Sequence, residues 1–353
     1  MKRTFTYLLI IVLLVCGKQG YDLLSDYQQI QSLHTGSLSD IAEEVVAIPL
    51  QDTGEYPIKN ARYIRLEGNH LFLVSNGTLY HFNRSGVFIR RITNPEDIQV
   101  ANYVINPVNR QLIVLGNTND IFYYSYEGNL LSRTKLNNHL PNQHLLSLFL
   151  YKDRILTTEE CIHEDPSTHI SCVEKQVVEY DTSFRKIKTH KIAPVNMERS
   201  GCPINCLSPI VSVEKDSEEI YVYAPSMQPE NLLRDTLYLR QKRQSQALAN
   251  FTDTDALPLL PVRLGIRIWI SSYYNPEDKL KNYMFCYDTK NDRSWQVKEG
   301  LKDNFYQTGT VCDLEAMDPY SHSYSFCKTG EAIKKAFPGQ EESLILFIVK
   351  LKA

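Results

Sequence analysis

One short element recurs along the chain and limits the folds that are open to it. An aromatic residue ends a predicted strand, a polar turn follows, and a strand rich in Ile, Leu, Arg and Lys comes next. A period of about 40 to 50 residues with four short strands per unit is typical of β-propeller blades. Each blade has two apolar faces, so it must stack on its neighbours in a ring. The aromatic anchors, spaced by 42, 56, 58 and 49 residues, are Phe82, Tyr124, Tyr180, Tyr238 and Tyr287.

The strands between these anchors are short and paired. His70–Ser75 and Thr78–Asn83 flank Asn76-Gly77, which is a strong signal for a tight hairpin. Amphipathic helices are almost absent, and Glu331–Phe337 is the exception, bounded by Gly330 and Pro338. The pattern predicts an all-β fold. An open pair of β-sandwich sheets, or two separate β-domains, is the alternative.

The two ends of the chain predict a sixth blade. Ser343–Lys350 is a nearly continuous apolar strand, and Glu44–Leu50 is an apolar strand without a local partner. Pairing Glu44–Leu50 outside the C-terminal strand would close the ring and remove an exposed edge. We therefore predict a six-bladed β-propeller closed by its N-terminal strand, rather than a seven-bladed one.

The charge balance argues against one class of partner. The 353 residues carry 38 basic and 41 acidic side chains, which gives a formal net charge of −3. A nucleic-acid binder normally shows a basic footprint, and none is visible here, so we expect no nucleic-acid binding. We also predict no cofactor and expect a monomer.

The N-terminus is typical of an export signal. Lys2 and Arg3 precede an apolar run, Tyr7–Val15, which is too short to span a bilayer as a helix. Cys16 follows directly and resembles the lipidated cysteine of a bacterial lipobox, although Val15 is unusual at its position. An ordinary signal peptide cut after Cys16 is the alternative. We predict a signal and lipobox region over 1–16, a tether over 17–40 and one propeller domain over 41–353, held in the periplasm or at the outer membrane.

Three segments carry a resemblance to a known family. Ile41–Leu50, the layout of His70–Ile92 and the ending Glu342–Lys352 resemble the six-bladed β-propeller lipoproteins of Bacteroidetes bacteria. That family belongs to the broader TolB-like and NHL-like propeller group. The resemblance implies a propeller fold, export and attachment to a membrane through a lipid, but no particular reaction.

Six-bladed relatives that are calcium-dependent lactonases or lyases place their polar ligands on loops over the central channel. Side chains of this kind lie near the predicted innermost strands here, and we consider them as channel-mouth candidates. No catalytic or metal-binding role is predicted for any one of them. The candidates are Asp97, Asn102, His144, Arg263, Glu315 and Asp318.

The cysteines offer a second kind of site. Cys161 and Cys172 bracket a polar stretch between two strands, Arg154–Thr158 and Glu174–Asp181, that should be neighbours. In an oxidising compartment we predict that the two form a disulfide. Free thiols, or a zinc site completed by His163 and His169, remain the alternatives. Two other cysteine features have structural interpretations: the C-x3-C spacing of Cys202 and Cys206 is not a redox motif, and Cys286 in an apolar strand predicts an inert core residue.

Two function classes remain. Neither a Walker A motif nor GxSxG, HExxH or a dinucleotide fingerprint is present in the sequence. We therefore favour a non-enzymatic binding or scaffold propeller at the cell envelope, with a glycan, peptide or protein as its ligand. A metal-dependent hydrolase or lyase with its site at the channel mouth is the alternative.

Overall fold

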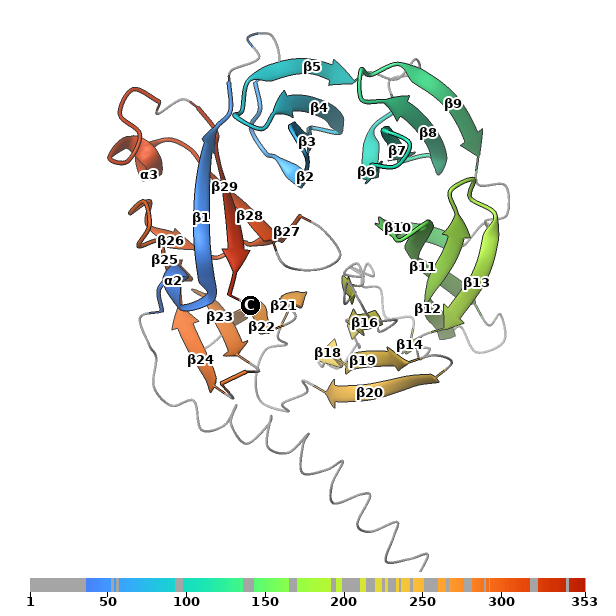
Figure 1. Ribbon diagram of the computed structural model, residues 1–353. Helices are drawn as coiled ribbons and strands as arrows, with labels where there is room; N and C mark the ends of the chain where they lie inside the picture. The colour runs from blue at the N-terminus through green and yellow to red at the C-terminus, as the bar shows by residue number, and fades with distance from the viewer. Residues whose placement is uncertain are drawn as a thin grey trace, which may run out of the picture.

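The computed structural model describes residues 36–51, 54, 57–92, 98–135, 143–164, 170–191, 195–198, 210–213, 220–223, 226–227, 233–234, 236–241, 244–250, 260–264, 267–275, 281–288, 290–291, 293–317, 323–340 and 343–352. In the strands within 160–175 and 195–264 it describes the backbone alone. Across these residues, six sheets of four or five strands stand side by side in a ring (Figure 1). The predicted six-bladed propeller is confirmed.

The blades follow the order of the chain, and each first strand lies nearest the central axis (Figure 1). Blades 1 and 2 are β2 (Arg62–Glu67), β3 (His70–Ser75), β4 (Thr78–Asn83), β5 (Phe88–Ile92), then β6 (Val100–Asn106), β7 (Gln111–Gly116), β8 (Asp120–Ser125) and β9 (Leu130–Lys135). Blade 3 is β10 (Gln143–Tyr151), β11 (Arg154–Glu164), β12 (Ile170–Asp181) and β13 (Lys186–Lys191), with β14 (Val195–Glu198) added beside β12.

The second half of the ring repeats the plan. Blade 4 is β15 (Ile210–Val213), β16 (Ile220–Tyr223), β19 (Thr236–Gln241) and β20 (Gln244–Asn250), and a small hairpin joins β17 (Ser226–Met227) to β18 (Leu233–Arg234). Blade 5 is β21 (Leu260–Leu264), β22 (Ile268–Asn275), β23 (Lys281–Asp288) and β24 (Arg293–Lys298). Blade 6 is β27 (Glu315–Ala316), β28 (Ser323–Lys328), β29 (Ile345–Leu351) and β1 (Ala42–Pro49).

The closing strand pairs as the sequence predicts. β1 lies antiparallel outside β29, with register pairs running from Ala42 opposite Leu351 to Pro49 opposite Ile345. Just before β1, the short helix α2 (Leu38–Ile41) buries both of its end residues in the core shared by blades 5 and 6. The first and last segments of the chain therefore complete one sheet. β1 therefore covers the edge of β29 that would otherwise be exposed.

Smaller elements connect blades 5 and 6. β25 (Leu301–Lys302) pairs with β26 (Thr310–Val311), and α3 (Glu331–Lys334) lies between β28 and β29. α3 confirms a helix inside the predicted Glu331–Phe337 segment, although its helical part is shorter. Ile333 anchors this helix by packing into the core.

The core lies between neighbouring blades. One cluster joins blades 1 and 2 through Phe72, Tyr103 and Phe122, and another joins blades 6 and 1 through Leu71, Phe82 and Leu346. The five anchor aromatics all lie on the third strand of a blade, in β4, β8, β12, β19 and β23. The anchors with described side chains, which are Phe82, Tyr124 and Tyr180, are buried. The aromatic residue that recurs in the sequence therefore marks the same position of each blade, where it packs against the neighbouring blade.

A polar side chain after the anchor organises the turn to the fourth strand. Oδ1 of Asn83 accepts hydrogen bonds from the backbone N–H groups of Ser85 and Val87, both at 2.9 Å. Asp181 makes the equivalent pair of bonds with Ser183 and Arg185, again at 2.9 Å. A short polar side chain at this position satisfies the turn's backbone donors. This requirement explains why the polar turn recurs with the aromatic anchor.

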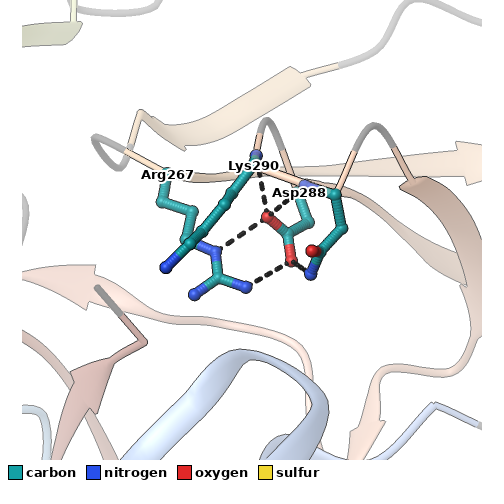
Figure 2. Close-up of polar contacts among 4 residues, drawn as sticks. Arg267, Asp288 and Lys290 are labelled. Carbon is teal, nitrogen blue, oxygen red and sulfur yellow. Dashed lines mark hydrogen bonds and ion pairs between the residues drawn. The ribbon is translucent and has the colours of Figure 1, made fainter.

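The corresponding turn of blade 5 is held by a bidentate ion pair. Figure 2 shows Asp288 between Arg267 and the turn. Arg267 Nε and Nη2 each donate to a carboxylate oxygen of Asp288 at 2.8 Å, and the N–H of Lys290 donates to Oδ1 at 3.0 Å. The hydrogen bonds from Arg267 lower the pKa of Asp288 to about 2. Asp288 therefore holds the turn while fully ionised at neutral pH.

Candidate functional site

The innermost strands share a local irregularity. The pairing of the first strand with the second shifts register at Arg62–Arg65 in β2, Val100–Asn102 in β6 and Leu145–Ser147 in β10. β21 has a similar shift between Leu260 and Arg263. A β-bulge bends a strand and redirects a side chain, and bulges are frequent next to binding sites. The wall around the axis is therefore built from bent strands.

In β2 the bulge coincides with an unusual backbone conformation. Tyr63 has a φ of 51°, in the left-handed region that a residue with a side chain seldom adopts. Its N–H donates to Oε2 of Glu315 on β27 at 3.1 Å, and its carbonyl accepts a hydrogen bond from the Tyr103 hydroxyl at 2.7 Å. Blades 6, 1 and 2 are thus joined through the backbone of Tyr63.

Arg65 lies beside this junction. Its guanidinium group is 5.4 Å from the centre of the Tyr103 ring, and its Nη1 donates to the carbonyl of Met317 at 3.4 Å. Burial raises the pKa of both Tyr63 and Tyr103, with a further increase from the negative charge of Glu315. The two phenols keep their protons at neutral pH, so this cluster offers hydrogen bonds and a cation rather than a nucleophile.

A pocket of about 330 Å³ adjoins the same wall. Its charged lining residues are Arg65 and Glu67 on β2 and Lys152 just after β10. Apolar side chains from three other strands, including Ile105, Leu150 and Ile348, complete the lining. Four consecutive blades around the ring, 6, 1, 2 and 3, therefore contribute to one concave site. A few convergent polar groups on an apolar wall are the usual composition of a ligand site.

The channel-mouth candidates do not converge in the described part of the chain. Glu315 binds the backbone of Tyr63, and Asn102 is buried with its Oδ1 accepting a hydrogen bond from the N–H of Tyr103 at 2.8 Å. His144 lies on β10 and Arg263 on β21, where the backbone alone is described. Two further candidates, Asp97 and Asp318, lie outside the described residues.

The pocket residues lie at the other end of the innermost strands from Asn102 and His144. Asn102 and His144 are near the starts of β6 and β10. Glu67 ends β2, and Lys152 comes directly after β10. Arg65, Glu67 and Lys152 were not among the candidates predicted from the sequence. Their shared signal is a charged side chain within or directly after an innermost strand, which is visible only once those strands are known.

The cysteines divide into described and undescribed side chains. Cys286 on β23 is fully buried, which confirms the predicted core position, and burial raises the pKa of its thiol. β11 and β12 are paired as predicted, but the side chains of Cys161, His163 and Cys172 are not described. His169, Cys202 and Cys206 lie outside the described residues, so the disulfide stays a prediction.

No group of three or more His, Cys, Asp or Glu side chains is placed to hold a metal among the side chains that are described. In the same part of the chain, no helix has both the length and the apolar character needed to cross a membrane. The predicted export segment at 1–16 lies outside the described residues.

Comparison with known proteins settles the family. A family described as "6-bladed beta-propeller" matches residues 23–228, which is more than half of the chain. The chain belongs to this family of six-bladed β-propellers. No curated protein matches the chain.

Solved structures are also similar to this chain. The Pan2 WD40 domain of Neurospora crassa has 11% identity and a TM-score of 0.45, with 84% of this chain and 79% of that chain covered. The Cps50 (Swd1) propeller of Myceliophteria thermophila has 9% identity and a TM-score of 0.47, covering 87% and 100%. A Bacteroides caccae protein of unknown function has 13% identity and a TM-score of 0.41, covering 69% and 84%.

Proposed function

We propose that this six-bladed propeller is an exported binding protein of the cell envelope that holds its ligand in the pocket at the central wall, without catalysing a reaction. The observation that carries the proposal is the pocket of about 330 Å³ lined by strands of four successive blades. Blades hold their innermost strands in fixed relative positions, so a site made from several of them is preformed.

The lining favours a ligand with an apolar body and a polar, preferably anionic, group. Ile105, Leu150 and Ile348 would contact the apolar part. Arg65 and Lys152 bring two positive charges to the pocket against the single negative charge of Glu67. A short glycan that carries a carboxylate, or a peptide terminus, has this combination of groups.

A pocket-filling variant tests this site. Ile105→Trp would fill the cavity, whereas Val108→Trp adds the same side chain three residues later at a position that is 88% exposed. Short glycans and peptides are screened by thermal shift against the wild type and both variants. We expect ligands that raise the melting temperature of the wild type and of Val108→Trp, with no effect on Ile105→Trp.

Two results would contradict the proposal. A ligand that stabilises Ile105→Trp as much as the wild type binds elsewhere on the molecule. Conversion of a bound ligand to product, lost on removal of metal, would instead establish the hydrolase or lyase alternative. Circular dichroism of each variant, which must match the wild-type spectrum, controls for unfolding.

Export and attachment through Cys16 complete the proposal. The apolar run directly before Cys16 and the resemblance to lipoproteins of Bacteroidetes support this part. A propeller tethered through the segment between Cys16 and α2 would keep its pocket close to ligands of the envelope.

A further inference from the structure

One face of the ring is defined by the turns that follow the first and third strands of blades 1 to 3. The pocket identifies this face, because Glu67 ends β2, Pro107 follows β6 and Lys152 follows β10, and all three line the pocket. Neighbouring strands within each blade are antiparallel, so the third strand ends on the same side as the first, and the fourth strand begins there. We call this side of blades 1 to 3 the pocket face.

Exposed apolar side chains gather on the pocket face. Among the side chains that the structure describes, eight large apolar residues are exposed. Six of the eight lie in the turns of the pocket face or in the first two residues of a fourth strand, and they are Val87, Ile89, Val108, Leu130, Leu131 and Ile187. Exposed apolar residues that are scattered singly are ordinary, whereas a group of them on one face indicates an interaction surface.

Three of these side chains occupy the same position in successive blades. β5, β9 and β13 form the outer edge of the ring (Figure 1), and each contains one bulged residue without a partner on the third strand. The bulged residues Ile89, Leu131 and Ile187 are 39%, 51% and 49% exposed. A bulge protects a sheet edge and redirects a side chain, but edge protection is served by charged residues, lysine above all. An aliphatic residue at all three bulges therefore indicates contact with an apolar partner.

The turns of the pocket face also carry an excess of positive charge. They contain four basic and two acidic residues, all exposed, although the whole chain has a net charge of −3. The basic residues are Arg84, Arg110, Lys152 and Arg185, and the acidic residues are Glu127 and Asp153. Charges at the adjoining strand ends cancel, since Glu67 and Asp181 balance Arg154 and Lys186. A partner of this surface should therefore combine an apolar layer with negative charge.

The N-terminal segment reaches the ring on the same side. In blade 6, Met317 follows β27 and Ser323 begins β28, and both line the pocket. β29 therefore ends on the side of the pocket, and β1 begins there at Ala42. Residues 17–35 separate Cys16 from Gly36, the first described residue, and a stretch of this length spans at most about 70 Å when fully extended.

We infer that the pocket face of blades 1 to 3 docks on a bilayer that contains anionic lipids. The bulged aliphatic side chains enter the interfacial region of the bilayer, and the basic residues of the turns contact lipid phosphates. The biological setting rests on the proposed lipid on Cys16, which would hold this side of the ring near a membrane. A lipid and a weak protein surface together supply the two signals that stable attachment requires. The pocket lies on the docked side, so its ligand is taken up next to the bilayer.

The surface alone binds weakly and reversibly. Each basic residue close to an anionic membrane strengthens binding by about fivefold. A net excess of two charges and a few partly inserted aliphatic side chains should give half-maximal binding at roughly millimolar lipid, which is weaker than binding through a single acyl chain. A chain without its lipid therefore still leaves the membrane fraction on dilution.

Vesicle binding by the full chain with Cys16→Ala tests the inference, because this parent protein carries no lipid. The parent is sedimented with phosphatidylcholine vesicles that contain about 30% phosphatidylglycerol, and with vesicles of phosphatidylcholine alone. We expect binding to the anionic vesicles at low salt, at least about tenfold weaker binding to the neutral vesicles, and weakening of the former in about 0.5 M salt.

Variants in the parent background locate the contact. Combined Ile89→Ser, Leu131→Ser and Ile187→Ser should weaken binding to anionic vesicles at least about tenfold, and Arg84→Gln should weaken it about fivefold. Val46→Ser is the matched control, because Val46 is 43% exposed in the middle of the outer strand β1, away from the turns, and it should leave binding unchanged. Circular dichroism spectra of all variants must match that of the parent.

Tryptophan fluorescence gives a second, local measurement. Leu131→Trp should shift its emission to shorter wavelength when anionic vesicles are added, because the new side chain enters the interfacial region. Val46→Trp should show no shift beyond that of the parent.

Three outcomes would overturn the inference. The first is a parent that binds neither kind of vesicle at several times the expected lipid concentration. The second is equal binding by the parent and the triple serine variant. The third is self-association of the parent that the triple variant abolishes while vesicle binding is unchanged, which would establish a contact between copies of the chain instead. None of these results depends on whether Cys16 is lipidated or on what the pocket binds, so failure here is distinct from failure of the proposed function.

Discussion

Acid should destabilise this propeller through one buried histidine. His81 on β4 is 3% exposed, its ring is stacked on Phe72 at 4.3 Å, and its Nε2 is 2.9 Å from Nδ1 of His70. Its own Nδ1 is buried and has no hydrogen-bond partner among the described residues. Protonation would therefore place an N–H and a positive charge in the interface of blades 1 and 2 without an acceptor.

The size of the effect follows from the pKa. Burial is the main cause that lowers the pKa of His81 from 6.5 to about 4, and the neighbouring His70 and Arg90 lower it further, against Glu127. Because the folded pKa is depressed, stability is fully present above pH 6.5 and is lost as the pH falls toward 4. For these two pKa values, the free energy of unfolding should fall by about 2.5 kcal/mol between roughly pH 7.5 and pH 4.5.

The assay compares His81→Phe with the wild type. Phenylalanine keeps the stacking on Phe72 and cannot titrate. The free energy of unfolding of each protein is measured by urea denaturation at several pH values in that interval. The free energy of unfolding of the wild type, taken relative to that of His81→Phe, should fall by about 2.5 kcal/mol as the pH falls, since other titrating groups cancel. Parallel pH profiles for the two proteins would refute the reasoning.

Four further predictions concern closure, turns and export. Gly86→Ala should lower the free energy of unfolding by more than about 2 kcal/mol, because the φ of Gly86 is +85° and a Cβ there would lie 2.1 Å from a carbonyl oxygen of β1. Gly68→Ala, with open space around it, is the control and should lower it by about 1 kcal/mol in the same denaturation assay. Asp288→Ala should cost about 2 to 3 kcal/mol at pH 7, a loss that disappears as the pH falls from about 3.8 through 2. Removing residues 1–50 should expose the edge of β29 and cause aggregation, measured by light scattering; a monomer of wild-type stability would contradict the role of β1. Cys16→Ala should move the protein from the membrane fraction to the soluble fraction, and unchanged fractionation would exclude the lipid anchor.

The fold was predictable because one packing requirement repeats. An anchor aromatic on the third strand of a blade packs in the core between blades, and the polar residue after it satisfies the next turn, as Phe82 and Asn83 show. Both requirements select residue types within a few positions of each other, so they can be recognised from the local sequence without information on distant contacts. The same holds for closure, because Glu44–Leu50 and Ser343–Lys350 are apolar strands that have no partner nearby.

The candidate site was not predictable in the same way, because its residues depend on pairs far apart in the chain. Glu315 was selected for its charge and its place near an innermost strand, yet its observed partner is the backbone of Tyr63, more than 250 residues earlier. That contact exists because a bulge turns Tyr63 into the left-handed region. No residue type in the Arg62–Arg65 segment predicts that bulge.

Register is the common reason for what the sequence left open. Along the chain, Cys161 and Cys172 read as two ends of one loop, which favours a disulfide. In the structure the register differs by two positions, because Cys161 pairs with Glu174 and Cys172 pairs with His163. A shift of two preserves the face of every residue and changes only which side chains stand opposite. The pattern of polar and apolar residues is identical in both registers, so hydrophobic periodicity cannot say which residue lies opposite Cys161, and non-reducing peptide mapping decides whether the two cysteines are cross-linked.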